Sequence, residues 1–413
     1  MAYQEISTGL DLGSSKIRAV AIQRLTDNTW QAIGAAETDS QGITKGLITD
    51  IEAAVSAISE CLEKAERMIG VPIERAAIGV SGTHIKTLES RGVVAVAKAD
   101  GEIKEEDVTR VIEAAQTVAT PPNYEILHVI PRNFSVDNQT NIKDPLGLVG
   151  VRLEVNTQII MGLSSQIKNL TKCIYRTGVD ISELVFSILA TAESTLTKKQ
   201  REIGVALVNI GLATTSLVVF EEDDVLLSTV LPIGDGHITS DIAIGLRTSL
   251  TTAEAVKLEF GQALAEKVNK RDEFDLSKID HQEKERSFVS LRHVAEIIQA
   301  RVEEIFSLVN QELKKIDRAG MLPAGVILTG GGAKLPGIVE LAKEEFKLPA
   351  FLGCPLDLET TIDKVDDPAF TTALGLALWG RQSVRYTGFH LSKLSSIENT
   401  VGKIRSWFKS LIP

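Results

Sequence analysis

The sequence predicts an α/β protein in which one strand-turn-strand unit occurs twice. Residues 8–20 and 205–219 each contain two apolar runs joined by a bend that places Asp or Asn, then Gly, and then small hydroxyl residues. A third segment, "LTGGGAKLPGI" at residues 328–338, sets three glycines between an apolar run and a helical pattern. Two similar halves predict a duplicated domain whose copies face each other across a cleft.

The first half begins with the strand-turn-strand unit. It continues with a strand, a helix and another strand, predicted over residues 30–36, 51–68 and 76–80. From residue 81 to about residue 157 the pattern changes, with one clear helix at residues 105–119 and the breakers "TPPN" and "DPLG" among strand-like pieces. We therefore expect a compact insertion within the first half.

The second half follows a predicted helix at residues 166–175 and the segment "ELVFSILATAESTL". It has its own insertion, at about residues 234–301, in which the charged stretch 266–287 is predicted to form a loop or a hairpin. A long helix to residue 316, the triple-glycine segment and a helix in "DPAFTTALGLALWG" complete this half.

The composition of the 413 residues excludes several classes of protein. With 44% hydrophobic and 24% charged residues, the chain is able to bury more than one core. Its net charge of −11 argues against non-specific binding of nucleic acid, because phosphates would be repelled. The three cysteines lie far apart, without metal-ligand spacing. The N-terminal residues lack the pattern of a secretion signal and no apolar run approaches about 18 residues, so we expect a cytoplasmic protein.

The bend "LDLGSSK" at residues 10–16 has the residue types of a phosphate-binding turn. Gly13 lets the backbone bend tightly, so the N–H groups of Ser14, Ser15 and Lys16 can converge on a phosphate. Asp11, at the end of the strand, is placed to hold a hydrated Mg²⁺. The alternative is an ordinary hairpin with a solvated Asp.

The bend "VNIGLATTS" at residues 208–216 would form the opposing phosphate turn. The triple glycine carries no side chains, which allows the sugar and base of a nucleotide to lie flat against the backbone. Two facing turns and this third element, in this order, predict binding of ATP or a similar nucleotide.

The order of these three elements resembles that of the actin, Hsp70 and hexokinase superfamily. Within it, the chain is similar over nearly its whole length to the FtsA family of bacterial cell-division proteins. The most specific matches are "GITKGLITDIE", "IGVSGTHIKTLESRGVVAV", "IKDPLGLVGVRLEV", "LATAESTLT" and "LTGGGAKLPGI". The resemblance implies an actin-like ATPase fold: duplicated ribonuclease-H-like domains around a nucleotide cleft, with an inserted FtsA-type (SHS2) subdomain and a C-terminal amphipathic helix.

The resemblance also implies a division of the chain into subdomains. The expected boundaries are 4–80 and 158–200 for subdomain 1A, 81–157 for 1C, 201–233 and 302–366 for 2A, 234–301 for 2B, 367–380 for a return helix to 1A, 381–392 for a linker and 393–413 for a membrane-targeting helix.

Carried over position by position, the resemblance assigns the nucleotide contacts. They are Asp11, Gly13, Ser14, Ser15 and Lys16 in the first turn, Asn209, Gly211, Thr214 and Thr215 in the second, Glu254 and Lys257 at the ribose, and Gly330, Gly331, Gly332 and Ala333 at the base. Glu254 and Lys257 would share one face of a helix, so an ion pair on the surface is the alternative for them. Glu193 is the expected acid that orients the attacking water, together with Thr214.

The second turn departs from the superfamily pattern. Relatives usually place Asp and then two or three glycines there, whereas this chain has Asn209, Gly211, Leu212 and Ala213. An Asn side chain supplies no negative charge near Mg²⁺, and the bulkier residues restrict positive φ. Because phosphoryl transfer depends on positioning and charge stabilisation, we expect ATP binding with weak or absent ATPase activity. The nucleotide would then act mainly as a conformational and assembly ligand.

The C-terminal residues carry apolar side chains at helical spacing. The positions are Leu394, Ile397, Val401, Ile404, Phe408 and Leu411, with Trp407 at the margin and Lys403, Arg405 and Lys409 flanking or opposing the stripe. From the residues alone, the stripe could pack on the protein's own core, form a short coiled-coil seam or lie in a lipid surface. The resemblance favours the lipid surface, because FtsA chains typically end in a membrane-targeting helix.

The resemblance therefore implies a protein that binds ATP with Mg²⁺, polymerises with itself into actin-like filaments and anchors the FtsZ ring to the cytoplasmic face of the cell membrane at the division site. It would also recruit later division proteins. The C-terminal tail of FtsZ would dock on residues 234–301, with Arg301 as a candidate contact. Two alternatives are a pilus-assembly ATP-binding module, which usually lacks a terminal lipid-binding helix, and a small-molecule kinase of the hexokinase superfamily, which would turn over ATP briskly.

Overall fold

The computed structural model describes residues 5–27, 29–97, 101–119, 121–279, 287–355, 359–360 and 362–384. The chain divides into two compact units. The first unit joins the residues up to Thr83 with Asn169–Leu378, and the second joins His84–Lys168 with the residues from Trp379 onward. The first unit contains both copies of the strand-turn-strand sequence.

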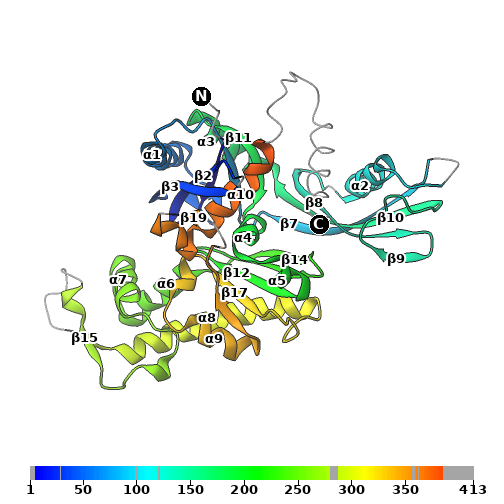
Figure 1. Ribbon diagram of the computed structural model, residues 1–413. Coiled ribbons are helices and arrows are strands. Elements are labelled where there is room, and N and C mark those ends of the chain that lie inside the picture. The colour runs from blue at the N-terminus through cyan, green and yellow to red at the C-terminus, as the bar shows by residue number, and fades with distance from the viewer. Residues whose placement is uncertain are drawn as a thin grey trace. The chain divides into compact units, whose positions relative to one another are not determined.

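The first sheet of this unit has six strands in the order β11-β6-β1-β2-β3-β19 (Figure 1). Their bounds are Ile6–Leu12 for β1, Lys16–Arg24 for β2, Trp30–Asp39 for β3, Arg75–Val80 for β6, Asp180–Phe186 for β11 and Glu359–Thr360 for β19. β1, β2 and β3 run antiparallel, whereas β6 is parallel to β1 and β11 is parallel to β6. The carboxyl ends of β1 and β6 therefore lie at the same edge of the sheet.

The second sheet repeats this arrangement in the order β14-β13-β12-β17-β18. Its strands are β12 (Val205–Ile210), β13 (Thr215–Glu221), β14 (Asp224–Leu231), β17 (Val326–Thr329) and β18 (Ala350–Leu352). β12, β13 and β14 run antiparallel, whereas β17 is parallel to β12 and β18 is parallel to β17. The five strands of the second sheet match β11, β6, β1, β2 and β3 of the first in order and direction, and only β19 has no counterpart. This match confirms the predicted duplication.

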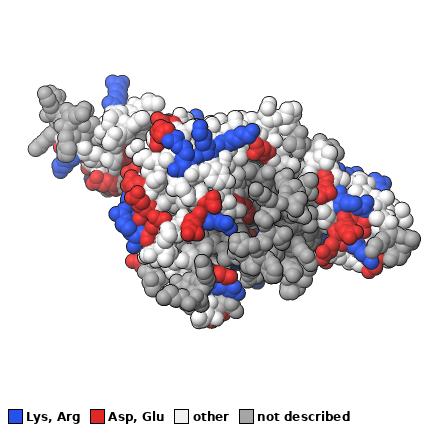
Figure 2. Space-filling model, turned by 90° about the horizontal axis from the view of Figure 1, so that it is seen from above, with Lys and Arg blue, Asp and Glu red and all other residues white. Residues whose placement is uncertain are grey.

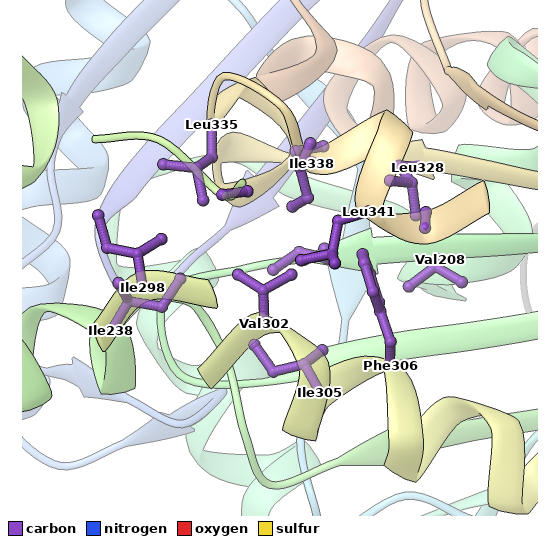
Figure 3. Close-up of a cluster of buried hydrophobic side chains, with 14 of the residues drawn as sticks. Val208, Ile238, Ile298, Val302, Ile305, Phe306, Leu328, Leu335, Ile338 and Leu341 are labelled. Carbon is purple, nitrogen blue, oxygen red and sulfur yellow. The ribbon is translucent and has the colours of Figure 1, made fainter. Parts of the chain in front are cut away.

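Helices cover the second sheet with a continuous apolar core (Figure 3). The long helix α8 (Leu291–Lys315) buries side chains at helical spacing, among them Ile298, Val302, Ile305 and Phe306. In Figure 3 these side chains lie among those of the two parallel strands and of α9 (Ile338–Phe346). The edge strands and the glycine segment at residues 330–332 are thereby held on a rigid support.

The remaining helices of this unit connect the strands. They are α1 (Ile51–Ile69), α3 (Ser164–Arg176, which begins in the second unit), α5 (Lys198–Ile203), α6 (Asp235–Leu246) and α7 (Leu250–Phe260). Two small pairs accompany them: β4 (Ile43–Thr44) with β5 (Leu47–Ile48), and β15 (Glu273–Asp275) with β16 (Phe288–Ser290). β15 lies inside the charged stretch 266–287 and pairs antiparallel with β16, which directly follows the stretch; this pairing agrees with the hairpin alternative of the prediction.

The helices α4 (Ser187–Thr195) and α10 (Thr371–Val384) connect the two halves of this unit. α4 follows β11 and contacts β6 and β11 of the first sheet as well as β12 and β13 of the second, whereas α10 packs on Val20 and Ile22 in the first sheet. The two helices meet at Gly375, where a Cβ atom would lie 1.9 Å from the carbonyl oxygen of Ala190. Each half is therefore in contact with a helix from the other half of the sequence: the second sheet contacts α4, and the first sheet contacts α10.

The second unit contains a four-stranded antiparallel sheet in the order β7-β10-β8-β9. The strands are β7 (Lys86–Ala95), β8 (Tyr124–Val136), β9 (Gln139–Ile142) and β10 (Arg152–Leu163), and the helix is α2 (Glu105–Ala119), as predicted. Val111, Ile112 and Ala115 of α2 pack in a core with residues of β8 and β10. α2 lies close to β7 because Gly92 has no side chain: a Cβ atom there would lie 2.0 Å from the carbonyl oxygen of Val111.

The described surface carries charges of both signs. On the face seen in Figure 2, Lys and Arg side chains lie beside Asp and Glu side chains. Many are paired, as in the contact between Arg176 and Glu52 at 2.6 Å, and such exposed pairs contribute little to stability. Within the described ranges, no helix is long and apolar enough to cross a membrane.

Candidate functional site

The first turn joins β1 to β2 at the carboxyl edge of the first sheet. A Cβ atom on Gly13 would lie 2.6 Å from the carbonyl oxygen of Lys16, so the bend needs glycine. The side chain of Lys16 pairs with Asp39, at 2.6 Å, so its ammonium group does not cover the backbone of the turn. Asp11 is half-buried, and burial raises its pKa to about 6 against the opposing effect of the Arg18 guanidinium. Its carboxyl group is therefore mostly ionised at neutral pH.

The second turn joins β12 to β13 and is closed by a hydrogen bond from Gly211 N to Thr214 O, at 2.9 Å. The first amides of α6 hold its other carbonyl groups: Asp235 N donates to Gly211 O at 2.8 Å and Gly236 N donates to Leu212 O at 2.7 Å. A Cβ atom on Gly234 would lie 2.4 Å from Gly211 O, so this approach also requires glycine. The turn and the N-terminus of α6 thus form one rigid element.

The triple glycine packs directly on the strand that leads into the second turn. Gly330 has φ of +86°, and a Cβ atom there would lie 2.3 Å from Asn209 Oδ1. Asn209 Nδ2 in turn donates to Thr372 Oγ1 on α10, at 3.0 Å. Gly331, in contrast, has no atom within 4 Å of the position that its Cβ would take. The sequence prediction of an open backbone surface therefore fits Gly331.

The predicted ribose contacts form a buried ion cluster. Lys257 Nζ lies 2.8 Å from Glu254, 2.6 Å from Asp235 and 2.9 Å from Thr239 Oγ1, and its side chain is only 4% exposed. Burial raises the pKa of Asp235, while the Lys257 ammonium opposes that shift. The ion pair between Glu254 and Lys257 is present, as the spacing suggested. All three N–H groups of the Lys257 ammonium are taken up by its partners, so Glu254 is the residue of this pair that remains accessible to a ligand.

Asp235 was missed in the sequence analysis. Its signal in the sequence is an acidic residue that follows a strand and a glycine and begins a helix, where negative charge is favoured. That signal is common at helix starts, so it does not single out a site.

The two turns are linked across the halves of the unit. Ser81 follows β6 of the first sheet, and its Oγ lies 3.4 Å from the Oγ of Ser216, on the strand that leaves the second turn. The residues predicted for the two phosphate turns are therefore brought to one region of the first unit.

Glu193 does not lie with Thr214, and this corrects the sequence prediction. Glu193 Oε1 pairs with Arg201 at 2.9 Å, and Arg201 also pairs with Asp223 at 3.2 Å. Asp223 belongs to the bend between β13 and β14, whereas Thr214 belongs to the bend at the opposite end of β13. Seven strand residues separate the two bends, which corresponds to roughly 20 Å. The reason is that α4 runs away from the turns, so its last residues reach the far edge of the second sheet.

Comparison with known proteins identifies the family. The family described as "SHS2 domain inserted in FTSA" matches residues 82–161, and that described as "Cell division protein FtsA" matches residues 206–375. The chain is 35% identical to cell division protein FtsA of Pseudomonas aeruginosa, over 91% of this chain and 89% of that protein. It is 36% identical to FtsA of Bacillus subtilis, over 94% and 86% of the two chains.

The chain belongs to the FtsA family of cell division proteins.

Solved structures support the fold of this FtsA-family chain. The PilM–PilN type IV pilus biogenesis complex aligns with a TM-score of 0.66 at 18% identity, covering 91% of this chain and 98% of that chain. MreB5 of Spiroplasma citri bound to ADP aligns with a TM-score of 0.54 at 13% identity, covering 92% and 98%. These likenesses confirm the actin-like fold. The much higher identity to FtsA decides against the pilus-assembly module as the family.

Arg301, the candidate partner contact, is held by acidic neighbours. Its Nε and Nη2 atoms lie 2.5 and 2.9 Å from the carboxylate of Asp241 on α6, and its Nη1 donates to Glu304. These bonds favour a role in joining α8 to α6.

Nearby helices present large apolar side chains that the sequence analysis did not single out: Ile244 on α6 is 75% exposed, and Leu250 and Leu258 on α7 are 61% and 76% exposed.

The predicted membrane-binding residues lie outside the described residues. These are Leu394, Ile397, Val401, Lys403, Ile404, Arg405, Trp407, Phe408, Lys409 and Leu411. The predicted linker lies outside them from residue 385 onward, and the predicted subdomain boundaries remain predictions.

Proposed function

We propose that this FtsA-family protein binds ATP between its two turns and uses the bound state to polymerise and to anchor the FtsZ ring to the membrane. The observation that carries the nucleotide part is the pair of matching turns, β1 to β2 and β12 to β13, linked by the contact between Ser81 and Ser216. The open backbone at Gly331 supports a site for the base beside them.

The residues of each turn have distinct roles in this proposal. The backbone of residues 13–16 and of residues 211–214 would hold the phosphates, residues 330–333 the base, and Glu254 the ribose. The half-buried carboxylate of Asp11 is a hard oxygen ligand and fits Mg²⁺ bound through water. Mg²⁺ would neutralise charge on the phosphates there.

Weak or absent hydrolysis follows from the neutral side chain at the second turn and from the position of Glu193. The amide of Asn209 is engaged with Thr372, and Glu193 is engaged with Arg201 at the far edge of the sheet. Neither supplies a carboxylate beside the phosphates. The nucleotide would then serve as an assembly ligand.

Replacing Gly330 with Ala is expected to abolish ATP binding. The new Cβ would meet Asn209 Oδ1 at 2.3 Å and displace the glycine segment from the second turn. Gly320 is the matched control, because it also has positive φ (+71°) but open space around it. Titration with a fluorescent ATP analogue should show binding for the wild type and for Gly320→Ala, and none for Gly330→Ala. A wild type that binds no ATP at millimolar concentration would refute the proposal.

The anchoring part of the proposal rests on family membership and on the C-terminal apolar stripe. A single amphipathic tail binds lipid weakly, and many tails on one filament bind tightly by effective concentration. The protein would thus act at the cytoplasmic face of the membrane at the division site, where it would hold FtsZ and recruit later division proteins.

The exposed apolar side chains on α6 and α7 are the proposed docking surface for the C-terminal tail of FtsZ. Leu258→Asp, which places a charge on this surface, is expected to weaken binding of an FtsZ tail peptide at least about tenfold, as for loss of a hot-spot residue. Met321→Asp is the control, because Met321 is similarly exposed, at 66%, but lies outside α6 and α7. Fluorescence anisotropy of a labelled peptide measures the effect, and equal affinity for both variants would rule this surface out.

A further inference from the structure

The hairpin of β4 and β5 carries the segment "GITKGLITD" to the first turn. Ile43 pairs with Ile48, and Thr44 pairs with Leu47. The two residues at the tip, Lys45 and Gly46, have φ of 53° and 75°. Positive φ at both positions is the geometry of a two-residue hairpin turn whose twist matches that of its strands.

The base of the hairpin is fastened to the start of α1. The N–H groups of Thr49 and Asp50 both donate to the carbonyl oxygen of Gly42, at 2.8 and 3.2 Å. Ile43 is buried, and Asp50 caps α1 by accepting from Ala53 N at 3.1 Å. The tip is therefore presented by a supported base rather than by a free loop.

The tip is seated at the phosphate edge of the first sheet. Gly46 N donates to Ser14 Oγ of the first turn, at 3.4 Å. A Cβ atom on Gly46 would lie 2.1 Å from the carbonyl oxygen of Ser81, the residue whose hydroxyl meets Ser216 beside the second turn. The tip thus touches the first turn directly and is one residue removed from the strand that leaves the second turn.

Lys45 precedes Gly46, and the geometry of the turn does not explain why a lysine stands at this position. A residue with a side chain is disfavoured at positive φ, and Gly, Asn or Asp is the usual choice there. Its side chain is exposed, and among the described residues it has no ion-pair partner. A lysine in this conformation, set beside a turn suited to phosphate, supplies a mobile point charge that can reach an anion.

We propose that Lys45 contacts the terminal phosphate of the bound nucleotide and makes the site prefer the triphosphate to the diphosphate; this rests on the proposed ATP site. The elements proposed for the base and ribose, Gly331 and Glu254, both belong to the second half of the unit. The phosphate chain would therefore extend from the second half toward the first. Its last phosphate would lie nearest to the first turn and to the hairpin tip.

The test compares Lys45→Gly with Lys347→Gly. Lys347 is the matched control because it is also exposed, also has positive φ (54°), and caps the C-terminus of α9 away from the turns. Both substitutions remove one positive charge and replace a lysine at positive φ with glycine, which adopts that backbone conformation without strain. Both variants should therefore fold. Dissociation constants are measured for fluorescent analogues of ATP and ADP with Mg²⁺. Lys45→Gly is expected to weaken ATP roughly tenfold and ADP less than about twofold, as for loss of one charged hydrogen bond, and Lys347→Gly should change neither.

The outcomes separate the two proposals. If the wild type binds neither nucleotide, the proposed ATP site is wrong. If the wild type binds ATP and Lys45→Gly binds it equally well, only the role of Lys45 is overturned. An equal loss of ATP and ADP by Lys45→Gly also overturns the terminal-phosphate assignment. Retention of the ATP preference by Lys45→Arg would support it, because that variant keeps the charge.

Discussion

Ending the chain after Leu391 is expected to abolish its co-sedimentation with anionic liposomes. The deleted tail contributes six apolar side chains at helical spacing, each worth on the order of 1 kcal/mol when half-buried in lipid. Its four basic residues against Glu398 give a local charge of +3 in a chain of net charge −11. Each basic residue adds about 1 kcal/mol near an anionic leaflet, while ordering the helix costs several kcal/mol in return.

A substitution pair tests the predicted apolar face of the C-terminal segment as well as its presence. Phe408→Asp puts a charge on the apolar stripe and should release the full-length chain from vesicles. Ser410→Asp puts the same charge outside the stripe and should have a smaller effect. ATP should increase the fraction of the full chain that sediments with the vesicles, because the proposed ATP-dependent assembly places many tails on one filament. A truncated chain that pellets as well as the full chain would assign the stripe to a protein surface instead.

Lys257→Met is expected to lower the free energy of unfolding by about 3–5 kcal/mol, because it leaves acidic partners in a buried site without their counter-charge. Lys257 is 4% exposed and bridges Asp235, Glu254 and Thr239. The loss should also remove ATP binding, since the cluster fixes the helix that carries Glu254. Lys267→Met is the matched control: its pair with Glu340, at 3.5 Å, is half-exposed, and its loss should change stability by less than about 0.5 kcal/mol. Urea denaturation measures both.

The pH dependence of the Lys257→Met defect follows from Asp235. Burial raises the pKa of Asp235 above its ordinary value, and removing Lys257 should raise it further, because the ammonium opposes that shift. A carboxyl group with a raised pKa binds more protons in the folded state, so folding gains stability as the pH falls through that window. The difference in stability between variant and wild type should therefore shrink at mildly acidic pH. The same difference at pH 5 and at pH 7.5 would show that Asp235 is not responsible.

Much of the fold could be predicted because its signals are local. The two bends with Gly and hydroxyl residues, and the 3.6-residue spacing in α2 and α8, depend only on neighbouring residues. The position of Glu193 could not be predicted, because it depends on the direction in which α4 leaves the first sheet. The cluster of Lys257 with Asp235 also escaped prediction, since it joins residues of two helices through long-range packing.

The hairpin at residues 43–48 could not be predicted for a different reason. Its tip has Lys-Gly where two-residue turns usually have Asn-Gly or Asp-Gly, so the turn signal in the sequence is weak. The segment was recognised as specific to the family, but its seat against Ser14 and Ser81 is visible only in three dimensions.

The crossing of α4 and α10 at Gly375 has a consequence for how such a chain can arise and be divided. Because α4 contacts both sheets and α10 packs on the sheet of the other half, either half alone would leave apolar surface uncovered at this crossing. We therefore expect the first unit to unfold as a single cooperative block despite its repeated sequence. A chain with only one copy of the repeat could bury this surface by exchanging its last helix with a second molecule.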